Sequence, residues 1–134
     1  MATNPTRMGK VQLEIMRVLW REGRATARTV TGELSRAAPI AHSTVQTLLR
    51  KLEAKGAVAH EADGRVFWFR PLVAQTDVRL TAVNELLERM YEGSLSGLVA
   101  HLLRSERVPP DEMARLRELV KAKEEADGGV DSAR

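Results

Sequence analysis

The amino-acid sequence predicts a mainly α-helical chain with one small β-hairpin, an α+β fold built from two parts. The first observation is the segment STVQTLLRKLEAKG at residues 43–56. Its apolar residues recur at i, i+3, i+4 and i+7, the spacing of one helical face. The second is the pair Asp63-Gly64 between two β-prone runs, a strong local signal for a hairpin. The third is the stretch 76–122, which carries wide apolar stripes at helical spacing.

Two shorter helices and a short strand are expected ahead of residue 43. The first helix spans about residues 9–22, where apolar side chains form one stripe, and Gly23 ends it. Ala25 is expected in a short strand. Thr26 then caps a second helix over about residues 27–35, because its hydroxyl suits the N-cap position.

The third helix and the hairpin complete the first part. Ser43, followed by Gln46 three residues later, has the spacing of a capping box, so the helix is expected to begin at Ser43. Gly56 is expected to end it, and strands follow at residues 58–61 and 66–70. Three helices followed by a hairpin are the plan of a winged helix-turn-helix.

The second part is expected to hold three further helices. Thr76 or Asp77 caps the first, which runs to about Tyr91. Residues 93–94, Gly-Ser, are expected to interrupt the helical structure and to cap the next helix. Residues 109–110, Pro-Pro, end that helix and start the last one, since proline suits the first helical turn.

The apolar content of the second part predicts pairing. We assign residues 1–73 to the winged domain, 74–125 to a helical dimerisation domain and 126–134 to a flexible tail. Short helices over about 60 residues cannot easily bury such stripes alone. A homodimer is therefore expected, the alternative being that these helices fold back on the winged domain. The expected interface residues are Val83, Leu86, Leu87, Met90, Leu95, Leu98, Val99, Leu102, Leu103, Leu116 and Val120.

The charge is distributed unevenly over the 134 residues. The net charge is +3, but residues 1–71 hold 12 Lys and Arg against 6 Asp and Glu, while the remainder is acidic. This asymmetry favours a polyanion as the partner of the first part, against chance variation of surface charge. The chain has no cysteine, no apolar run near the ~20 residues of a membrane helix and no signal-peptide core. A cytoplasmic protein is expected, without a membrane partner.

The helix at residues 43–56 carries the candidate DNA-reading side chains. While its apolar stripe packs on a core, its hydroxyl, amide and guanidinium groups point away and suit a major groove. Residues near the N-terminal end of such a helix reach deepest, so base reading is assigned to Ser43, Thr44, Gln46 and Thr47. Phosphate contact is assigned to Arg50, Lys51 and, past the hairpin turn, Arg65, with Arg7, Lys10 and Arg28 as lesser candidates. Arg65 has the minor groove as an alternative. The alternative for the whole set is an ordinary solvated helix face.

The aromatic run Phe67-Trp68-Phe69 is expected to serve mainly the fold. At least two of these rings should be core residues of the small sheet, with stacking on bases as the alternative.

Catalysis and metal binding find little support. His42, His60 and His101 are scattered, without metal-ligand spacing, and no nucleotide-binding or hydrolase motif is present. We therefore expect no enzyme activity, no metal and no cofactor.

Three segments together resemble the BlaI/MecI/CopY family of bacterial repressors. They are LEIM with LW at residues 13–20, STVQTLLRKL with KG at 43–56, and GRVFWFRPLV at 64–73. Similar pieces continue at 93–99 and from 111, so the resemblance covers roughly residues 8–120. It implies a dimeric winged-helix repressor that binds a palindromic operator and controls antibiotic-resistance or metal-homeostasis genes.

Two departures from the family pattern limit what the resemblance implies. Copper-responsive members carry a cysteine cluster that this chain lacks, so copper sensing by that route is excluded. Penicillinase-type members are cleaved between Asn and Phe, where this chain has His101-Leu102. An inactivating sensor protease remains open as a partner, but the same cleavage specificity does not carry over.

The favoured interpretation is a homodimeric transcriptional repressor of resistance or stress genes that binds double-stranded DNA. Two alternatives remain: a winged-helix module that binds another protein, and a regulator that senses a small ligand. The operator, the regulated genes and the inducing signal stay open.

Overall fold

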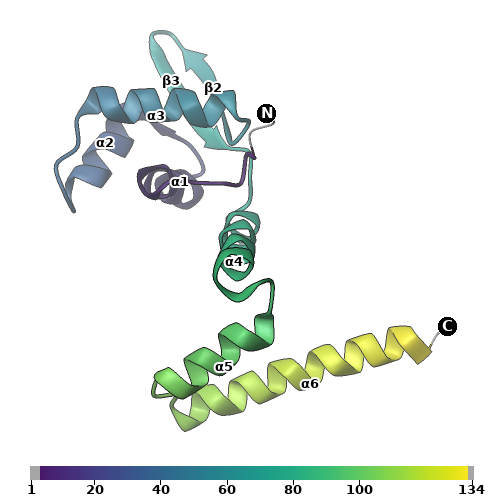
Figure 1. Ribbon diagram of the computed structural model, residues 1–134. Helices are drawn as coiled ribbons and strands as arrows, with labels where there is room; N and C mark the ends of the chain where they lie inside the picture. Colours follow the sequence, from purple (N-terminus) through teal and green to yellow (C-terminus); the bar gives the residue numbers. More distant parts are fainter. Residues whose placement is uncertain (1–3, 133–134) are drawn as a thin grey trace. The chain divides into compact units, whose positions relative to one another are not determined.

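The computed structural model describes residues 4–132 and divides the chain into two compact units, residues 1–89 and 90–134 (Figure 1). The elements in chain order are α1 (Lys10–Glu22), β1 (Ala25–Thr26), α2 (Ala27–Ser35), α3 (His42–Ala54), β2 (Val58–Asp63), β3 (Val66–Pro71), α4 (Gln75–Tyr91), α5 (Leu95–Ser105) and α6 (Pro110–Ser132). This order confirms the predicted fold class.

The first unit packs α1, α2 and α3 against a three-stranded antiparallel sheet of order β1-β3-β2. Its core holds the inward stripes of the three helices and residues of all three strands. The largest fully buried side chains are Ile15, Met16, Leu19, Val30, Val45, Leu49, Leu52 and Val58. Loop chemistry supports this packing, as predicted: Gly23 and Gly56 take positive φ after α1 and α3, and the Thr26 hydroxyl accepts from the Thr29 N–H.

The start of α3 differs from the predicted capping box at Ser43. The helix begins one residue earlier, at His42, with Ala41 in the N-cap position and no side-chain cap. The N–H groups of Thr44 and Val45 both donate to the Ala41 carbonyl. Ser43 therefore lies inside the first turn, and its hydroxyl has no capping function.

The turn of the hairpin is shifted by one residue from the prediction. Asp63 pairs with Val66, so the two turn residues are Gly64 and Arg65, not Asp63 and Gly64. Among the described residues of this turn only Gly64 has a positive φ, +63°, which is the pattern of a type II′ turn. Arg65 thus lies in the turn itself, at the tip of the wing.

The aromatic run contributes less to the core than predicted. Phe69 is buried, whereas Phe67 is 48% exposed and Trp68 is half-buried. Side chains alternate across a strand, so Phe67 and Phe69 share one face, but only Phe69 belongs to the buried core. On the opposite face, the Arg24 guanidinium lies 4.5 Å from the centre of the Trp68 ring.

Helix α4 belongs to the first unit up to Arg89. It begins at Gln75, so Thr76 and Asp77 lie in its first turn instead of capping it. Val78 is buried, the Thr6 and Thr81 hydroxyls are 2.6 Å apart, and Arg7 Nε lies 2.6 Å from Glu85 Oε1. The segment before α1 therefore fastens α4 to the winged domain.

The second unit contains α5 and α6. Gly93 takes a φ of +81°, and the Ser94 hydroxyl caps α5 by accepting from the Gly97 N–H, as predicted. Pro110 opens α6, also as predicted, and this helix continues to Ser132, through most of the expected tail at 126–134. The proposed domain boundaries remain predictions.

The predicted interface residues of α4–α6 are mostly exposed within one chain. Leu87, Leu98 and Leu116 are half-buried, while Val83, Leu86, Met90, Leu95, Val99, Leu102, Leu103 and Val120 are between 39% and 63% exposed. Within residues 4–132 no helix is long and apolar enough to cross a membrane.

Candidate nucleic-acid interface

The outer face of α3 is polar and accessible over its whole length. Val45, Leu49 and Leu52 are fully buried on the inner side. All six candidates on this helix are exposed: Ser43, Thr44, Gln46, Thr47, Arg50 and Lys51. The helical period therefore places the predicted reading residues on the accessible face.

A groove separates α3 from the wing and brings together candidates that are distant in the sequence. Gln46 and Arg50 line it from α3, Arg28 from the N-terminal end of α2, and Arg65 from the wing tip. Figure 1 shows α3 lying beside the β2–β3 hairpin that forms the other wall. Four of the predicted DNA-binding residues thus face one channel.

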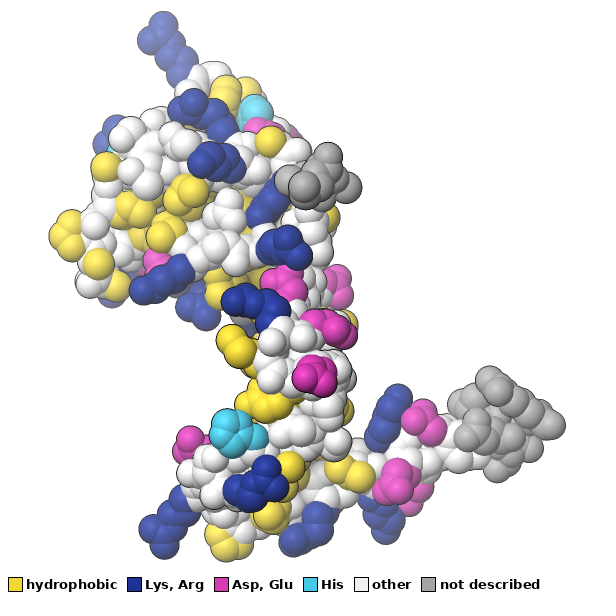
Figure 2. Space-filling view, viewed as in Figure 1, with side chains coloured by type: hydrophobic (Ala, Val, Ile, Leu, Met, Phe, Trp, Pro, Cys, Tyr) yellow, Lys and Arg dark blue, Asp and Glu magenta, His cyan; other side chains and the backbone are white. Residues whose placement is uncertain are grey.

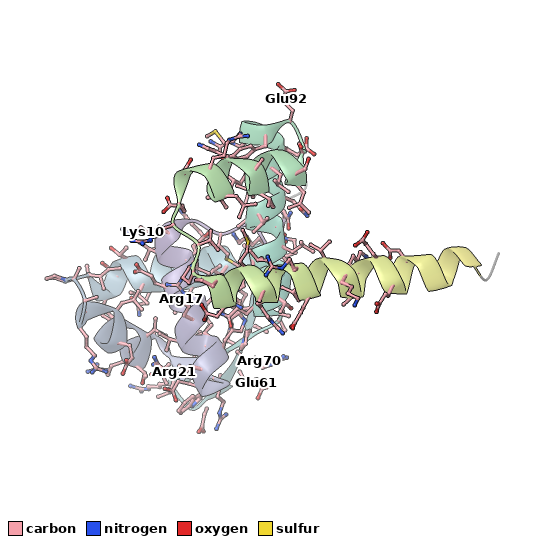
Figure 3. All side chains as sticks on the ribbon, turned by 90° about the horizontal axis from the view of Figure 1, so that it is seen from below. Lys10, Arg17, Arg21, Glu61, Arg70 and Glu92 are labelled. Atoms are coloured by element: carbon pink, nitrogen blue, oxygen red, sulfur yellow. The ribbon has the colours of Figure 1, made fainter. Side chains whose placement is uncertain are left out.

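The other candidates lie outside this groove. Ser43, Thr44, Thr47 and Lys51 occupy the rest of the exposed face of α3. Lys10 is exposed in the first turn of α1, which Figure 3 shows from below. The structure therefore does not gather Lys10 with the groove residues.

Some arginines of the first unit are paired with acidic side chains, whereas those that line the groove have no such partner among the described residues. Figure 2 shows Lys and Arg side chains spread over one face of this unit. Many of them have acidic neighbours: Arg21 and Arg36 both lie 3.3 Å from Glu33, Arg7 is paired with Glu85, and Arg70 lies 3.9 Å from Glu61 beside it (Figure 3). By contrast, within the described part of the chain Arg28, Arg50 and Arg65 form no ion pair. Three charges therefore remain for an external anion.

Three side chains that connect α3 to the wing were not among the predicted site residues. His60 Nδ1 on β2 lies 2.6 Å from Glu53 Oε2 on α3. The His60 ring stacks on Phe67 of β3, with centroids 4.3 Å apart and an interplanar angle of 19°. These contacts place helix and hairpin at one defined separation. These residues contact one another across different elements of the fold. The sequence does not show such contacts, so it gave no signal for these residues.

His42 is a fourth residue that the sequence analysis did not assign to the interface. It opens α3, is exposed, and lines the groove one turn before Gln46. Its Nδ1 lies 2.9 Å from the Thr31 hydroxyl on α2, and that hydroxyl also donates to the Ala27 carbonyl at 2.8 Å. The ring is thereby anchored to the preceding helix.

Lys55 fixes the other end of α3. Its ammonium donates to the Arg7 carbonyl and, at 3.1 Å, to Gln12 Oε1. Burial lowers the pKa of Lys55 from the usual value, and the nearby Arg7 guanidinium lowers it further.

No cluster of three potential metal ligands occurs among the residues that the structure describes.

Similar proteins are known over most of the chain. A family profile described as "Penicillinase repressor" matches residues 8–122. The penicillinase repressor of Bacillus licheniformis is 30% identical over 109 residues, which cover 81% of this chain and 85% of that protein. The transcriptional regulator BlaI of Mycobacterium tuberculosis (strain CDC 1551 / Oshkosh) is 32% identical over 114 residues, covering 84% and 81%.

A solved structure matches about half of the chain. This structure, the solution structure of the DNA binding domain of the repressor BlaI, aligns with part of the chain with a TM-score of 0.51 and 32% sequence identity. The alignment covers 56% of this chain and 92% of that domain.

Proposed function

This chain belongs to the penicillinase repressor family, and we propose that it is a sequence-specific DNA-binding transcriptional repressor that acts as a homodimer on a palindromic operator. The observation that carries the proposal is the groove between α3 and the wing. It combines three arginines without acidic partners in the described chain with the exposed polar face of α3. The similarity to the DNA binding domain of BlaI supports it.

In this proposal α3 enters the major groove of the operator. Its first turns present Ser43, Thr44, Gln46 and Thr47 to base edges, because the N-terminal residues of a recognition helix reach deepest. The cations that would contact the sugar–phosphate backbone are Arg50, Lys51, Arg65, Arg28 and Lys10. As a residue of the turn itself, Arg65 is the most advanced side chain of the wing, with access to the backbone or the minor groove.

The homodimer is proposed from the exposed apolar side chains of α4, α5 and α6. Leu95, Val99 and Leu102 are each at least 40% exposed in the single chain, and burying apolar surface of this kind drives association. Two copies related by a two-fold axis match the two half-sites of a palindrome. The proposed organisation is a winged domain at 1–73, a dimerisation domain at 74–125 and a tail at 126–134.

We further propose that the regulated genes are resistance or stress genes, since the relatives are named for penicillinase and for methicillin resistance. An inactivating protease that cuts near His101-Leu102 fits the exposure of both residues on α5. Loss of the dimer would then halve the DNA contacts and release the operator. The proposal assigns no catalytic activity to the chain.

The test is operator selection from random DNA with the full chain, followed by titration at several salt concentrations. We expect one enriched palindrome, and an affinity that falls steeply with salt because phosphate contacts release counterions. Selection of no sequence, or binding that is indifferent to salt, would contradict DNA reading. A winged-helix module that binds another protein would give the first of these results, selection of no sequence.

A further inference from the structure

Three atoms at the junction of α2 and α3 determine which nitrogen of His42 carries hydrogen. The Thr31 hydroxyl has a single hydrogen, and it lies 2.8 Å from the Ala27 carbonyl, which only accepts. The hydroxyl therefore donates to Ala27 and must accept from its other neighbour. That neighbour is His42 Nδ1, at 2.9 Å, so Nδ1 carries the hydrogen.

The hydrogen on Nδ1 determines the role of the other ring nitrogen, Nε2. In a neutral imidazole with hydrogen on Nδ1, Nε2 is an acceptor. His42 is exposed in the first turn of α3, and no hydrogen bond to its Nε2 occurs within the described residues. On the helix that would enter the major groove, His42 thus presents Nε2 as an acceptor that cannot donate.

We propose that His42 is a specificity-determining residue that accepts a hydrogen bond from an exocyclic amino group of a base. In the major groove only adenine N6 and cytosine N4 donate, while guanine and the O4 of thymine accept. Phosphate oxygens also only accept, so this nitrogen is unsuited to the backbone. Thr31 is then a positioning residue, because it selects the tautomer without contacting DNA.

The inference rests on the proposed function, and the experiment separates the two. The full chain first selects its operator from random DNA; selection of no sequence would contradict the proposed function itself. The same selection is repeated with His42→Phe, which keeps a ring of similar size and loses both nitrogens. Assays are run at about pH 8, above the usual titration range of imidazole.

With His42→Phe we expect discrimination at one base pair of each half-site to fall roughly three- to ten-fold, as for one lost hydrogen bond. Preference at the other base pairs, affinity for random DNA and the Tm should stay close to those of the parent. If every base-pair preference of the parent persists in His42→Phe, the inference is wrong.

Base analogues then identify the donor. Purine in place of adenine lacks the N6 amino group, and 2-pyrimidinone in place of cytosine lacks the N4 amino group. At the affected base pair, the analogue should weaken DNA binding by the parent. This loss of affinity should exceed the loss in His42→Phe by the same three- to ten-fold factor. The arm that shows the difference names the base; equal losses in both proteins would overturn the inference.

The Thr31 hydroxyl provides the second arm. Thr31→Val keeps the shape but removes the acceptor for Nδ1, so it should lower discrimination at the same base pair and add nothing when His42 is already Phe. Thr31→Ser should restore the discrimination. An effect of Thr31→Val that persists in the His42→Phe background would show that Thr31 acts on stability alone.

Discussion

The carboxylate of Glu53, near the C-terminal end of α3, lies 2.6 Å from Nδ1 of His60 on β2. The same imidazole stacks on Phe67 of the neighbouring strand. Helix α3 is thereby connected to the hairpin that carries Arg65. We expect the direction of the wing tip to depend on this connection.

Replacing His60 by Ala should weaken operator binding by about 1 kcal/mol, because the wing loses its contacts with α3 and Arg65 is no longer held toward DNA. Fluorescence anisotropy with a half-site duplex measures the effect. In an Arg65→Ala background the same substitution should cost nothing further. Additive losses would show that His60 does not act through Arg65.

Two residues of α3 should differ in how their removal acts. Thr47→Ala should flatten discrimination between operator and random DNA and leave non-specific binding nearly unchanged. Arg50→Ala should weaken both and reduce the slope of log affinity against log salt by about one, as expected for a phosphate contact. Titrations on both DNAs at several salt concentrations distinguish the two. If both variants bind like the parent, α3 is not the reading helix.

The exposed apolar side chains of α4, α5 and α6 should hold the dimer together. Leu102→Asp should yield monomers in analytical ultracentrifugation, because it places an unpaired charge in the proposed apolar interface. Ser105→Asp adds the same charge to the same helix at an exposed polar position and should remain dimeric. A dimeric Leu102→Asp variant would locate the interface elsewhere.

A truncation gives an independent test of the dimer. Removing residues 90–134 leaves the first unit with its α4 contacts, including buried Val78 and the Arg7–Glu85 pair. We expect a folded monomer that binds a half-site and has lost the avidity for the full operator. Dimerisation of this fragment would show that α5 and α6 are not needed for the interface.

Lys55→Met should lower the free energy of unfolding by about 1 kcal/mol, because it removes the hydrogen bonds to the Arg7 carbonyl and Gln12. The difference should also depend on pH. Since the folded pKa of Lys55 lies below 10.5, the unfolded chain binds more protons in the window between the folded and unfolded pKa values. The parent should therefore gain stability relative to Lys55→Met as pH rises through that window. Thermal melts of both proteins measure this trend, and a constant difference across the window would contradict it.

The elements that depend on local chemistry could be predicted from the amino-acid sequence alone. The 3.6-residue period places Val45, Leu49 and Leu52 inward and Thr47 outward whatever α3 packs against. Thr26 and Ser94 cap their helices with their own hydroxyls, which requires only the residues three positions later.

Only the tertiary structure decided where α3 begins, which residues form the wing turn and which side chains share the groove. His42 is held by Thr31 of another helix, and the hairpin register that shifts the turn to Gly64-Arg65 is set by strand pairing. Arg28 and Arg65 line one channel although they lie far apart in the chain. Such contacts depend on the packing of whole elements against one another, which the spacing of residues within one element does not determine.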